Sequence, residues 1–490
     1  MVKKINVGWF VVEEIPQNIP FMMGITKFMV QEWPKRGLGA EVKKYFTWFE
    51  KDSGKMCFVR EEFDKQAEFL SHKMLENPAW ALSVISKVER WSARFFVEAR
   101  RFGNLRFVNF SKQELVTSFE KVLRWHTLSH GVGSSVSWHA DANGERVSKA
   151  LLGMIGRRIK ENKLKVDKGV VFSVLSTPEK ESGLKKEEKG LLELVIKKSS
   201  QAALHRHAKK YEWLNYQYKG PAFPFSYFVD RFRALNPSKA KKLLKEIEDK
   251  DRMTKEKKRN LLAGLRLNHT ERLLVKMAQE MVFIKDYRKE SLYHGMYSYE
   301  PFFKELGRKF GLSIDQIRTM HWWEIIAFLK TGRINVDGLN ERMRLAVYFV
   351  SKKSYQIYSG RDAKKFLGHI KWERIKKKIG NEFSGSCAYP GKVRGRVKII
   401  NIPQDMSKMR KGDILVAHNT NPNLVPAMKI ARALVSGAGG LTCHTAIVAR
   451  EFHIPSVVGI SGIDKILKDG DMVEVDANKG IVRRLGTTGK

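Results

Sequence analysis

One segment near the C-terminus limits what this chain can fold into more than any other. Residues 435–459 read VSGAGGLTCHTAIVAREFHIPSVVG. The apolar residues 433–435 predict a strand, which runs into a loop that holds three glycines. A helix is then predicted to open at Cys443, with Thr442 in the N-cap position. Pro455 ends this helix, and residues 456–459 predict the next short strand.

A histidine at the opening of such a helix is placed to hold an anion. Glycines let backbone N–H groups converge, and the helix N-terminus adds the positive end of its dipole. A neutral imidazole nitrogen is also a competent nucleophile, so it can carry a phosphoryl group covalently. The candidate catalytic residues are therefore His444, Thr442 and Cys443, and the candidate phosphate-binding residues are Gly439, Gly440 and Leu441.

This segment resembles the swivelling phosphohistidine domain of the enzymes that use phosphoenolpyruvate (PEP). The family includes PEP synthase, pyruvate phosphate dikinase and rifampin phosphotransferase. Its pattern is Gly-Gly-x-Thr-(Ser/Cys)-His-x-Ala-Ile-(Ile/Val)-Ala-Arg-Glu-x-x-Ile-Pro-x-Val-Val-Gly, which residues 439–459 follow. Further blocks of the resemblance lie at residues 388–397, 412–416, 420–429 and 469–482.

The resemblance implies an α+β multidomain fold class. It predicts a C-terminal β/β/α swivelling phosphohistidine (mobile) domain at 387–486, reached through a linker at 376–386. Before it we expect a large, mainly α-helical, acceptor-like domain at 61–375, preceded by a mixed segment at 1–60. Within the helical part, residues 111–127 predict a helix that opens on a capping box, whereas Gly131–Ser135 predicts a loop.

Two domains of the complete family enzymes are not evident in this sequence. Residues 1–380 show too little strand alternation for a nucleotide-binding ATP-grasp domain, and the swivelling segment is not followed by the barrel that holds pyruvate and magnesium. The resemblance therefore implies a phosphotransferase component that is loaded by a separate ATP-grasp protein. Mg²⁺ and ATP are expected through that partner and not in the recognised domain. The acceptor is expected to be a small molecule, such as pyruvate, phosphoenolpyruvate or an antibiotic-like molecule, and another protein is the alternative.

The helical region offers a few residues that could bind an acceptor. Lys285 and Arg288 would place cations on one helix, suited to a phosphate or carboxylate, and Tyr211 and Trp213 could stack an acceptor or pack in the core. The nearby pair His205 and His207 points to different sides of a helix, so no metal site is predicted. Arg450 is expected to pair with a carboxylate such as Asp476.

The formal charge of +39 leaves a second reading open. Residues 381–490 hold 16 Lys and Arg against 9 Asp and Glu, so most of the excess lies in residues 1–380. Such a field would attract nucleic acid, but no nucleic-acid-binding motif accompanies it. A non-catalytic basic binding protein that retains the swivelling fold is thus the alternative, and a kinase with its own nucleotide site in residues 1–200 is a third possibility.

The remaining composition predicts a soluble, cytoplasmic protein. Three scattered cysteines do not make a disulfide framework, which favours a reducing compartment. The apolar run at the N-terminus is too short for a signal peptide, and no window approaches the length of a membrane span.

Overall fold

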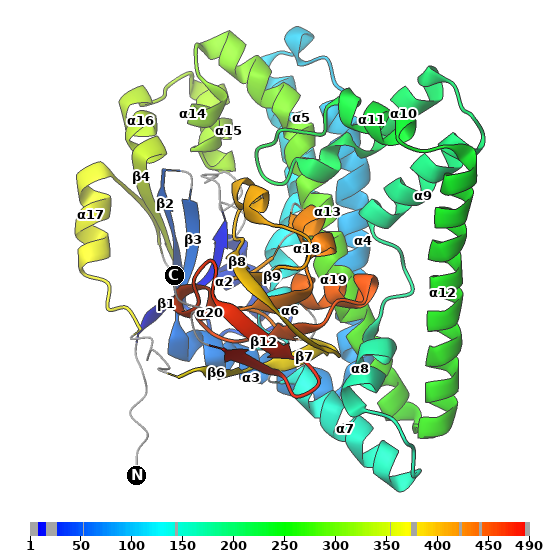
Figure 1. Cartoon of the computed structure of the whole chain (residues 1–490). Helices are drawn as coiled ribbons and strands as arrows, with labels where there is room; N and C mark the ends of the chain where they lie inside the picture. The colour runs from blue at the N-terminus through cyan, green and yellow to red at the C-terminus, as the bar shows by residue number, and fades with distance from the viewer. Residues whose placement is uncertain are drawn as a thin grey trace, which may run out of the picture.

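The computed structural model describes residues 8–15, 27–51, 53–142, 146–352, 354–373, 380–420, 424–440 and 443–485. A helical region precedes a C-terminal sheet region, as the sequence predicts (Figure 1). The helices before residue 380 are α2 (Lys27–Lys35), α3 (Arg60–Glu76), α4 (Pro78–Gly103), α5 (Lys112–His126), α6 (Ser134–Trp138), α7 (Val147–Glu161), α8 (Lys168–Ser176), α9 (Gly183–Ile196), α10 (Gln201–Tyr211), α11 (Phe225–Arg233), α12 (Pro237–Leu265), α13 (His269–Phe310), α14 (Ile314–Arg318), α15 (Trp322–Thr331), α16 (Val336–Arg344) and α17 (Gly360–Gly368).

The helical region is built around the long helices α4 and α13, which lie against each other (Figure 1). Asn268 caps α13 in a capping box with Glu271, and Gly311 ends the helix in the left-handed conformation (φ 67°). Gly295 faces the Phe95 ring so closely that a Cβ would collide with it. The absence of a side chain at residue 295 therefore sets the spacing between the two helices.

Local sequence signals predict one helix of this region correctly and miss another. The helix predicted at 111–127 is α5, and its capping box between Ser111 and Glu114 is present. The loop predicted at Gly131–Ser135 is wrong, because a π-helix over Thr127–Val132 leads directly into α6. Packing explains this, since a Cβ on Gly133 would meet Val88 and Arg288, and the Trp33 indole N–H donates to the carbonyl of Gly131 at 3.2 Å.

A five-stranded antiparallel sheet joins the two ends of this region. Its order is β1-β3-β2-β4-β5, formed by β1 (Trp9–Ile15), β2 (Lys44–Glu50), β3 (Ser53–Val59), β4 (Leu345–Ser351) and β5 (Tyr355–Ser359). Strands β4 and β5 lie inside the stretch for which we expected helices, and β4 pairs directly with β2. The N-terminal strands and residues 345–359 thus form one structural unit.

The C-terminal region forms an eight-stranded sheet in the order β6-β13-β12-β8-β9-β10-β11-β7. Strands β8 to β11 run parallel, and the outer strands pair antiparallel. The elements are β6 (Glu382–Ser384), β7 (Ser386–Tyr389), β8 (Lys392–Ile399), β9 (Ile414–Ala417), α18 (Val425–Ile430), β10 (Ala433–Ser436), α19 (His444–Phe452), β11 (Ser456–Val458), α20 (Ile463–Ile466), β12 (Met472–Asp476) and β13 (Ile481–Arg484).

Part of the expected linker belongs to this sheet. Residues 376–379 lie outside the described part of the chain, but Glu382–Ser384 is strand β6 and pairs with β13. The C-terminal sheet region packs on the helical region through α19 and β7, because Ala446 and Ala388 belong to the same hydrophobic core as α4 and α13. The helix that opens at His444 is therefore docked against the helical region.

Candidate functional site

His444 is the first residue of α19, directly after the glycine loop that follows β10. Cys443 occupies the N-cap position, with its backbone N–H donating to the carbonyl of Gly440 at 2.9 Å. Gly439 has φ 89°, and a Cβ there would meet the Cys443 side chain, so only glycine suits this turn. The candidates Leu441 and Thr442 lie outside the described residues.

The imidazole of His444 is held by a threonine that the sequence reading did not single out. Thr420 Oγ1 lies 2.8 Å from His444 Nδ1 and 2.9 Å from Thr445 Oγ1. Thr420 and Thr445 are both buried, whereas His444 keeps partial exposure. When Nδ1–H donates to Thr420 Oγ1, the Thr420 hydroxyl is left to donate to Thr445 Oγ1. Nε2 then carries a free electron pair.

The pairing of Thr420 with His444 follows from the sheet topology. Strands β9 and β10 are parallel neighbours, with Ala417 opposite Ser436, so the segments after them leave the same edge of the sheet. Thr420 lies in the first of these segments and His444 follows the second. The contact is therefore predictable from the sequence once β9 and β10 are taken as parallel neighbours.

The surroundings keep His444 neutral. Burial, and secondarily the positive charge of Lys289, lower the pKa of His444 to about 3. The ring is therefore unprotonated at neutral pH, which a nucleophile requires. Burial likewise raises the pKa of the neighbouring Cys443 thiol, although Lys285 acts in the opposite direction. Cys443 is consequently a thiol at neutral pH and not a competing thiolate.

Helix α13 supplies cations to this site. The charges of Lys289 and Lys285 act on His444 and Cys443 respectively. Lys289 Nζ lies 3.5 Å from the carboxylate of Glu13 on β1. The register of the β1–β3 pairing shifts between Val11 and Glu13. Burial disfavours the charge of Lys289, but Glu13 and Tyr293 hold the pKa of Lys289 above its usual value. Lys289 and Glu13 were missed from the sequence because their contact joins distant segments.

The other predicted acceptor residues lie deeper in the helical region. Arg288 is only 1% exposed, and its guanidinium bonds to Ser137 Oγ at 3.2 Å and to His130 Nδ1. Trp213 donates to the carbonyl of Lys210 at 2.9 Å and packs edge-on against Phe96. Tyr211 is buried beside His207, with ring centroids 4.9 Å apart. The structure thus brings Lys285 to the His444 site and encloses Arg288 and Tyr211 among other side chains. Trp213 lies on the wall of a separate cavity of about 1070 Å³.

The expected carboxylate partner of Arg450 is wrong. Its three guanidinium nitrogens are buried and have no hydrogen-bond partner within the described parts of the chain. Its guanidinium carbon lies 5.8 Å from the centre of the Phe172 ring of α8, and burial lowers the pKa of Arg450 to about 10. Asp476 instead lies 3.8 Å from Lys392. Docking of α19 on α8 has therefore enclosed a cation.

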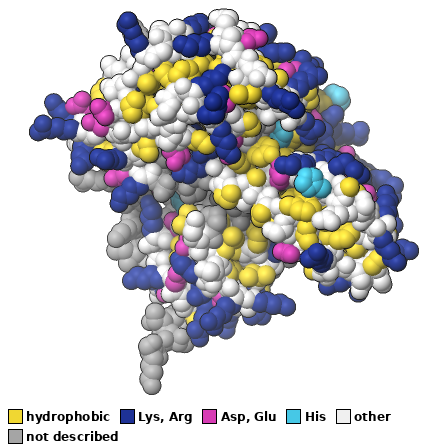
Figure 2. Space-filling model, turned by 90° about the horizontal axis from the view of Figure 1, so that it is seen from above, with side chains coloured by type: hydrophobic (Ala, Val, Ile, Leu, Met, Phe, Trp, Pro, Cys, Tyr) yellow, Lys and Arg dark blue, Asp and Glu magenta, His cyan; other side chains and the backbone are white. Residues whose placement is uncertain are grey.

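Neither a metal site nor a membrane span is found where the structure is described. No group of three or more His, Cys, Asp or Glu side chains among the described residues could hold a metal ion. No helix in the described ranges is both long and apolar enough to cross a bilayer. Figure 2 shows Lys and Arg side chains spread over one face of the molecule without a single basic block.

Comparison with known proteins matches the C-terminal region. Residues 409–480 fit the family model of the PEP-utilising enzyme mobile domain. The probable PEP synthase of Archaeoglobus fulgidus is 52% identical over 98 residues, which are 20% of this chain and 13% of that protein. The PEP synthase of Aeropyrum pernix is 50% identical over 99 residues, 20% of this chain and 12% of that protein. The chain thus covers about one eighth of the length of these relatives.

A solved structure also aligns with part of the chain. The holo-form of Thermococcus kodakaraensis aconitase X covers 22% of this chain at 24% identity, and 100% of that chain is aligned. The TM-score is 0.18, which is too low to support an argument about fold. The assignment therefore rests on the family model and the PEP synthase relatives, and it confirms the resemblance seen in the sequence: residues 409–480 are a mobile domain of the PEP-utilising enzyme family.

Proposed function

We propose that His444 accepts a phosphoryl group on Nε2 and passes it to an acceptor, as a component of a phosphotransferase. The observation that carries this proposal is the hydrogen-bonded chain from His444 through Thr420 to Thr445. With Nδ1–H donating to Thr420 and Thr420 donating to Thr445, the ring is the Nδ1–H tautomer in this proposal, and the lowered pKa of His444 keeps the Nε2 electron pair free at neutral pH.

The loading step follows from this arrangement. The Nε2 electron pair attacks phosphorus, and the bond from phosphorus to the leaving group breaks. The ring becomes an N-phosphoimidazolium whose Nδ1–H remains bonded to Thr420. Lys289 places a positive charge near the ring, where it opposes the charge of the phosphoryl oxygens. Phosphoryl transfer depends mainly on such alignment and charge neutralisation.

In this proposal the phosphoryl donor is bound by a separate ATP-grasp protein, together with ATP and Mg²⁺. Because α19 packs against the helical region, the proposal includes a movement of α19 away from that region when His444 meets such a partner. The segment 376–386 is the proposed place of that movement, as the resemblance implies.

Labelling of the full-length protein tests the proposal in two arms. Potassium phosphoramidate phosphorylates reactive histidines without a partner, and labelled ATP with a candidate ATP-grasp protein tests the enzymatic route. We expect label that is labile in acid and stable in base, and that is lost in His444→Ala. His205→Ala, which changes an exposed histidine of α10, is the matched control and should label like the wild type. Equal labelling of His444→Ala would contradict the proposal.

A further inference from the structure

The cavity whose wall includes Trp213 has a volume of about 1070 Å³ and lies within the helical region. Its walls come from α4, α10, α13 and α14, and from the segment that joins α10 to α11. The described residues that line it lie between Arg100 and Arg318, before the C-terminal sheet region begins. Cavities of roughly 300–1,000 Å³ hold drug-sized organic molecules, so this one has room for such a ligand within the helical region alone.

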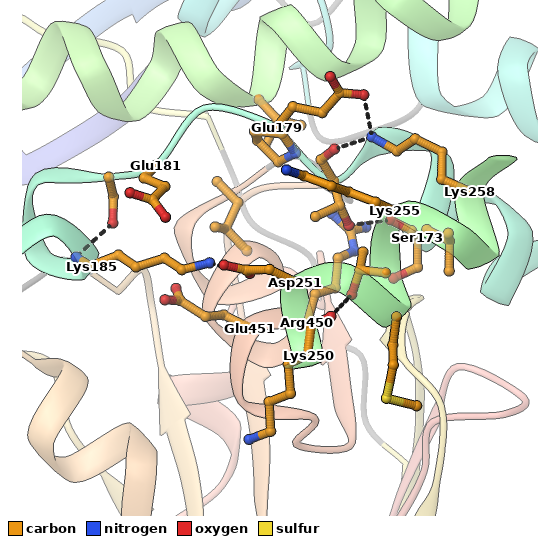
Figure 3. A pocket seen from close by; sticks show the side chains of 18 of the residues that line it. Ser173, Glu179, Glu181, Lys185, Lys250, Asp251, Lys255, Lys258, Arg450 and Glu451 are labelled. Atoms are coloured by element: carbon orange, nitrogen blue, oxygen red, sulfur yellow. Dashed lines mark hydrogen bonds and ion pairs between the residues drawn. The ribbon is translucent and has the colours of Figure 1, made fainter. Parts of the chain in front are cut away.

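The walls of this cavity are basic. Seven Lys and Arg line it against three Asp and Glu. A cavity of about 1130 Å³ between the helical region and the C-terminal sheet region has the opposite balance, with nine Asp and Glu against seven Lys and Arg. There, Lys185 and Asp251 reach toward each other and form an ion pair (Figure 3). The excess of cations is therefore a property of the Trp213 cavity and not of every hollow in this basic chain.

The carboxylates of the Trp213 cavity are already engaged. Each pairs with a cation of the same cavity: Glu212 with Lys209 at 3.1 Å, Glu300 with Lys304 at 2.8 Å, and Asp315 with Arg318 at 3.5 Å. On the rim, Arg100, Arg206 and Lys210 are exposed, and no ion pair of theirs is found among the described residues. These three positive charges therefore remain to attract an anion.

The buried residues that line the cavity form a polar floor. The Tyr216 hydroxyl donates to the carboxylate of Glu300 and accepts a hydrogen bond from Arg318 Nη2 at 2.8 Å. Arg318 Nε and His294 Nδ1 are buried and have no hydrogen-bond partner in the described parts of the chain. Buried polar atoms of native proteins are nearly always paired, so the floor has hydrogen-bonding capacity that the described side chains do not use.

We propose that this cavity binds a small organic phosphate, whose phosphate group is attracted by Arg100, Arg206 and Lys210. A phosphate monoester carries about 1.5 to 2 negative charges at neutral pH, which three cations can balance, and the arginine fork matches phosphate geometry. Apolar lining residues, among them Ala222 and Pro301, suit the carbon skeleton of the ligand. The site does not include His444, so the inference goes beyond the proposed function and does not depend on it.

A small ligand is favoured over nucleic acid by the shape of the site. Nucleic acid backbones bind to basic residues that are clustered on one face or along a stripe. Figure 2 shows Lys and Arg spread over one face without a single basic block. In the Trp213 cavity, by contrast, the rim cations surround a floor that holds the buried side chains of Tyr216 and Arg318.

Calorimetric titration of the full-length protein tests the proposal. The probes are uridine monophosphate and fructose 1,6-bisphosphate, with uridine and fructose as their uncharged counterparts and inorganic phosphate as the small anion. We expect at least one organic phosphate to bind about tenfold or more tightly than its uncharged counterpart and than inorganic phosphate. Binding of neither organic phosphate, or binding no tighter than that of inorganic phosphate, would overturn the proposal.

Three variants locate the site. Arg206→Glu/Lys210→Glu should weaken binding about tenfold or more, because two attractions become repulsions. The matched control is Lys241→Glu/Lys245→Glu, the same change one helical turn apart on α12, at exposed residues that line neither cavity. Ala222→Trp should fill the cavity and abolish binding without changing the charge. Thermal unfolding of each variant shows whether it is folded.

The remaining outcomes are equally decisive. Equal weakening in both double variants would show attraction to the overall charge, and unchanged binding in a folded Ala222→Trp variant would place the ligand elsewhere; either result would overturn the proposal. So would an RNA oligonucleotide that binds more tightly than both organic phosphates and is unaffected by Ala222→Trp. Phosphoramidate labelling of His444 should be normal in every variant, so failure of this proposal is distinct from failure of the proposed function.

Discussion

Substitution of Thr420 by Val tests whether the hydrogen-bonded chain at His444 controls its reactivity. Valine keeps the shape of threonine but removes the hydroxyl that lies 2.8 Å from His444 Nδ1 and 2.9 Å from Thr445 Oγ1. Thr420 is 1% exposed, so water cannot readily replace it. Leaving one buried group without its partner costs about 1–3 kcal/mol. If the lost hydrogen bond destabilises the Nδ1–H tautomer by that amount, His444 should be phosphorylated roughly 5- to 150-fold more slowly.

The assay is the rate of phosphoramidate labelling at neutral pH, followed by intact mass. Thr420→Ser retains the hydroxyl and should label within a few-fold of the wild type. Thermal unfolding of each variant separates loss of reactivity from loss of fold. Wild-type labelling rates in a folded Thr420→Val variant would refute the role of this hydrogen bond in selecting the tautomer.

Three further predictions concern stability. Burial lowers the pKa of His126, His139 and His294 to about 3, so the unfolded chain binds protons that the folded protein does not. The free energy of unfolding should therefore fall as the pH drops below 6.5, by up to about 2 kcal/mol for each histidine near pH 5. Urea unfolding at about pH 5 and at about pH 6.5 checks this. Gly295→Ala should lose about 1–3 kcal/mol by urea unfolding because its methyl group meets Phe95, whereas Gly368→Ala, in open space, should not. Arg450→Met removes a buried cation that has no hydrogen-bond partner among the described residues, and it should raise the unfolding free energy by about 1–4 kcal/mol; a large decrease would show that the guanidinium has a partner in solution.

The sequence predicted the elements around His444 because their signals are local. A strand, a glycine loop, a helix and a stop at Pro455 follow one another within 25 residues, and the structure has β10, α19 and β11 there. Strand β4 was missed for a different reason. Leu345–Ser351 is a short apolar run, which periodicity alone does not separate from a buried helix. The run forms a strand because it pairs with β2, which lies almost 300 residues earlier in the sequence.

The contacts that tune the site were beyond the sequence. Glu13 meets Lys289 across 276 residues, and Arg288 is enclosed by side chains from other helices. Arg450 lies six residues after His444 and does not share its helix face, which suggested a salt bridge with a carboxylate, but its guanidinium carbon lies 5.8 Å from the Phe172 ring of α8. Burial of a charge depends on which surfaces pack together, and only the tertiary structure gives that information.

The pairing of β2 with β4 has a consequence for how the chain is made. During synthesis, β2 and β3 emerge early, but the strand that covers the free edge of β2 follows about 300 residues later, a delay of roughly 15–60 s at typical translation rates. Throughout that interval a half-finished sheet presents unpaired backbone groups, which is the usual template for association between nascent chains. Ribosome-bound fragments that stop before Leu345 should therefore depend on chaperones far more than those that extend past Ser359.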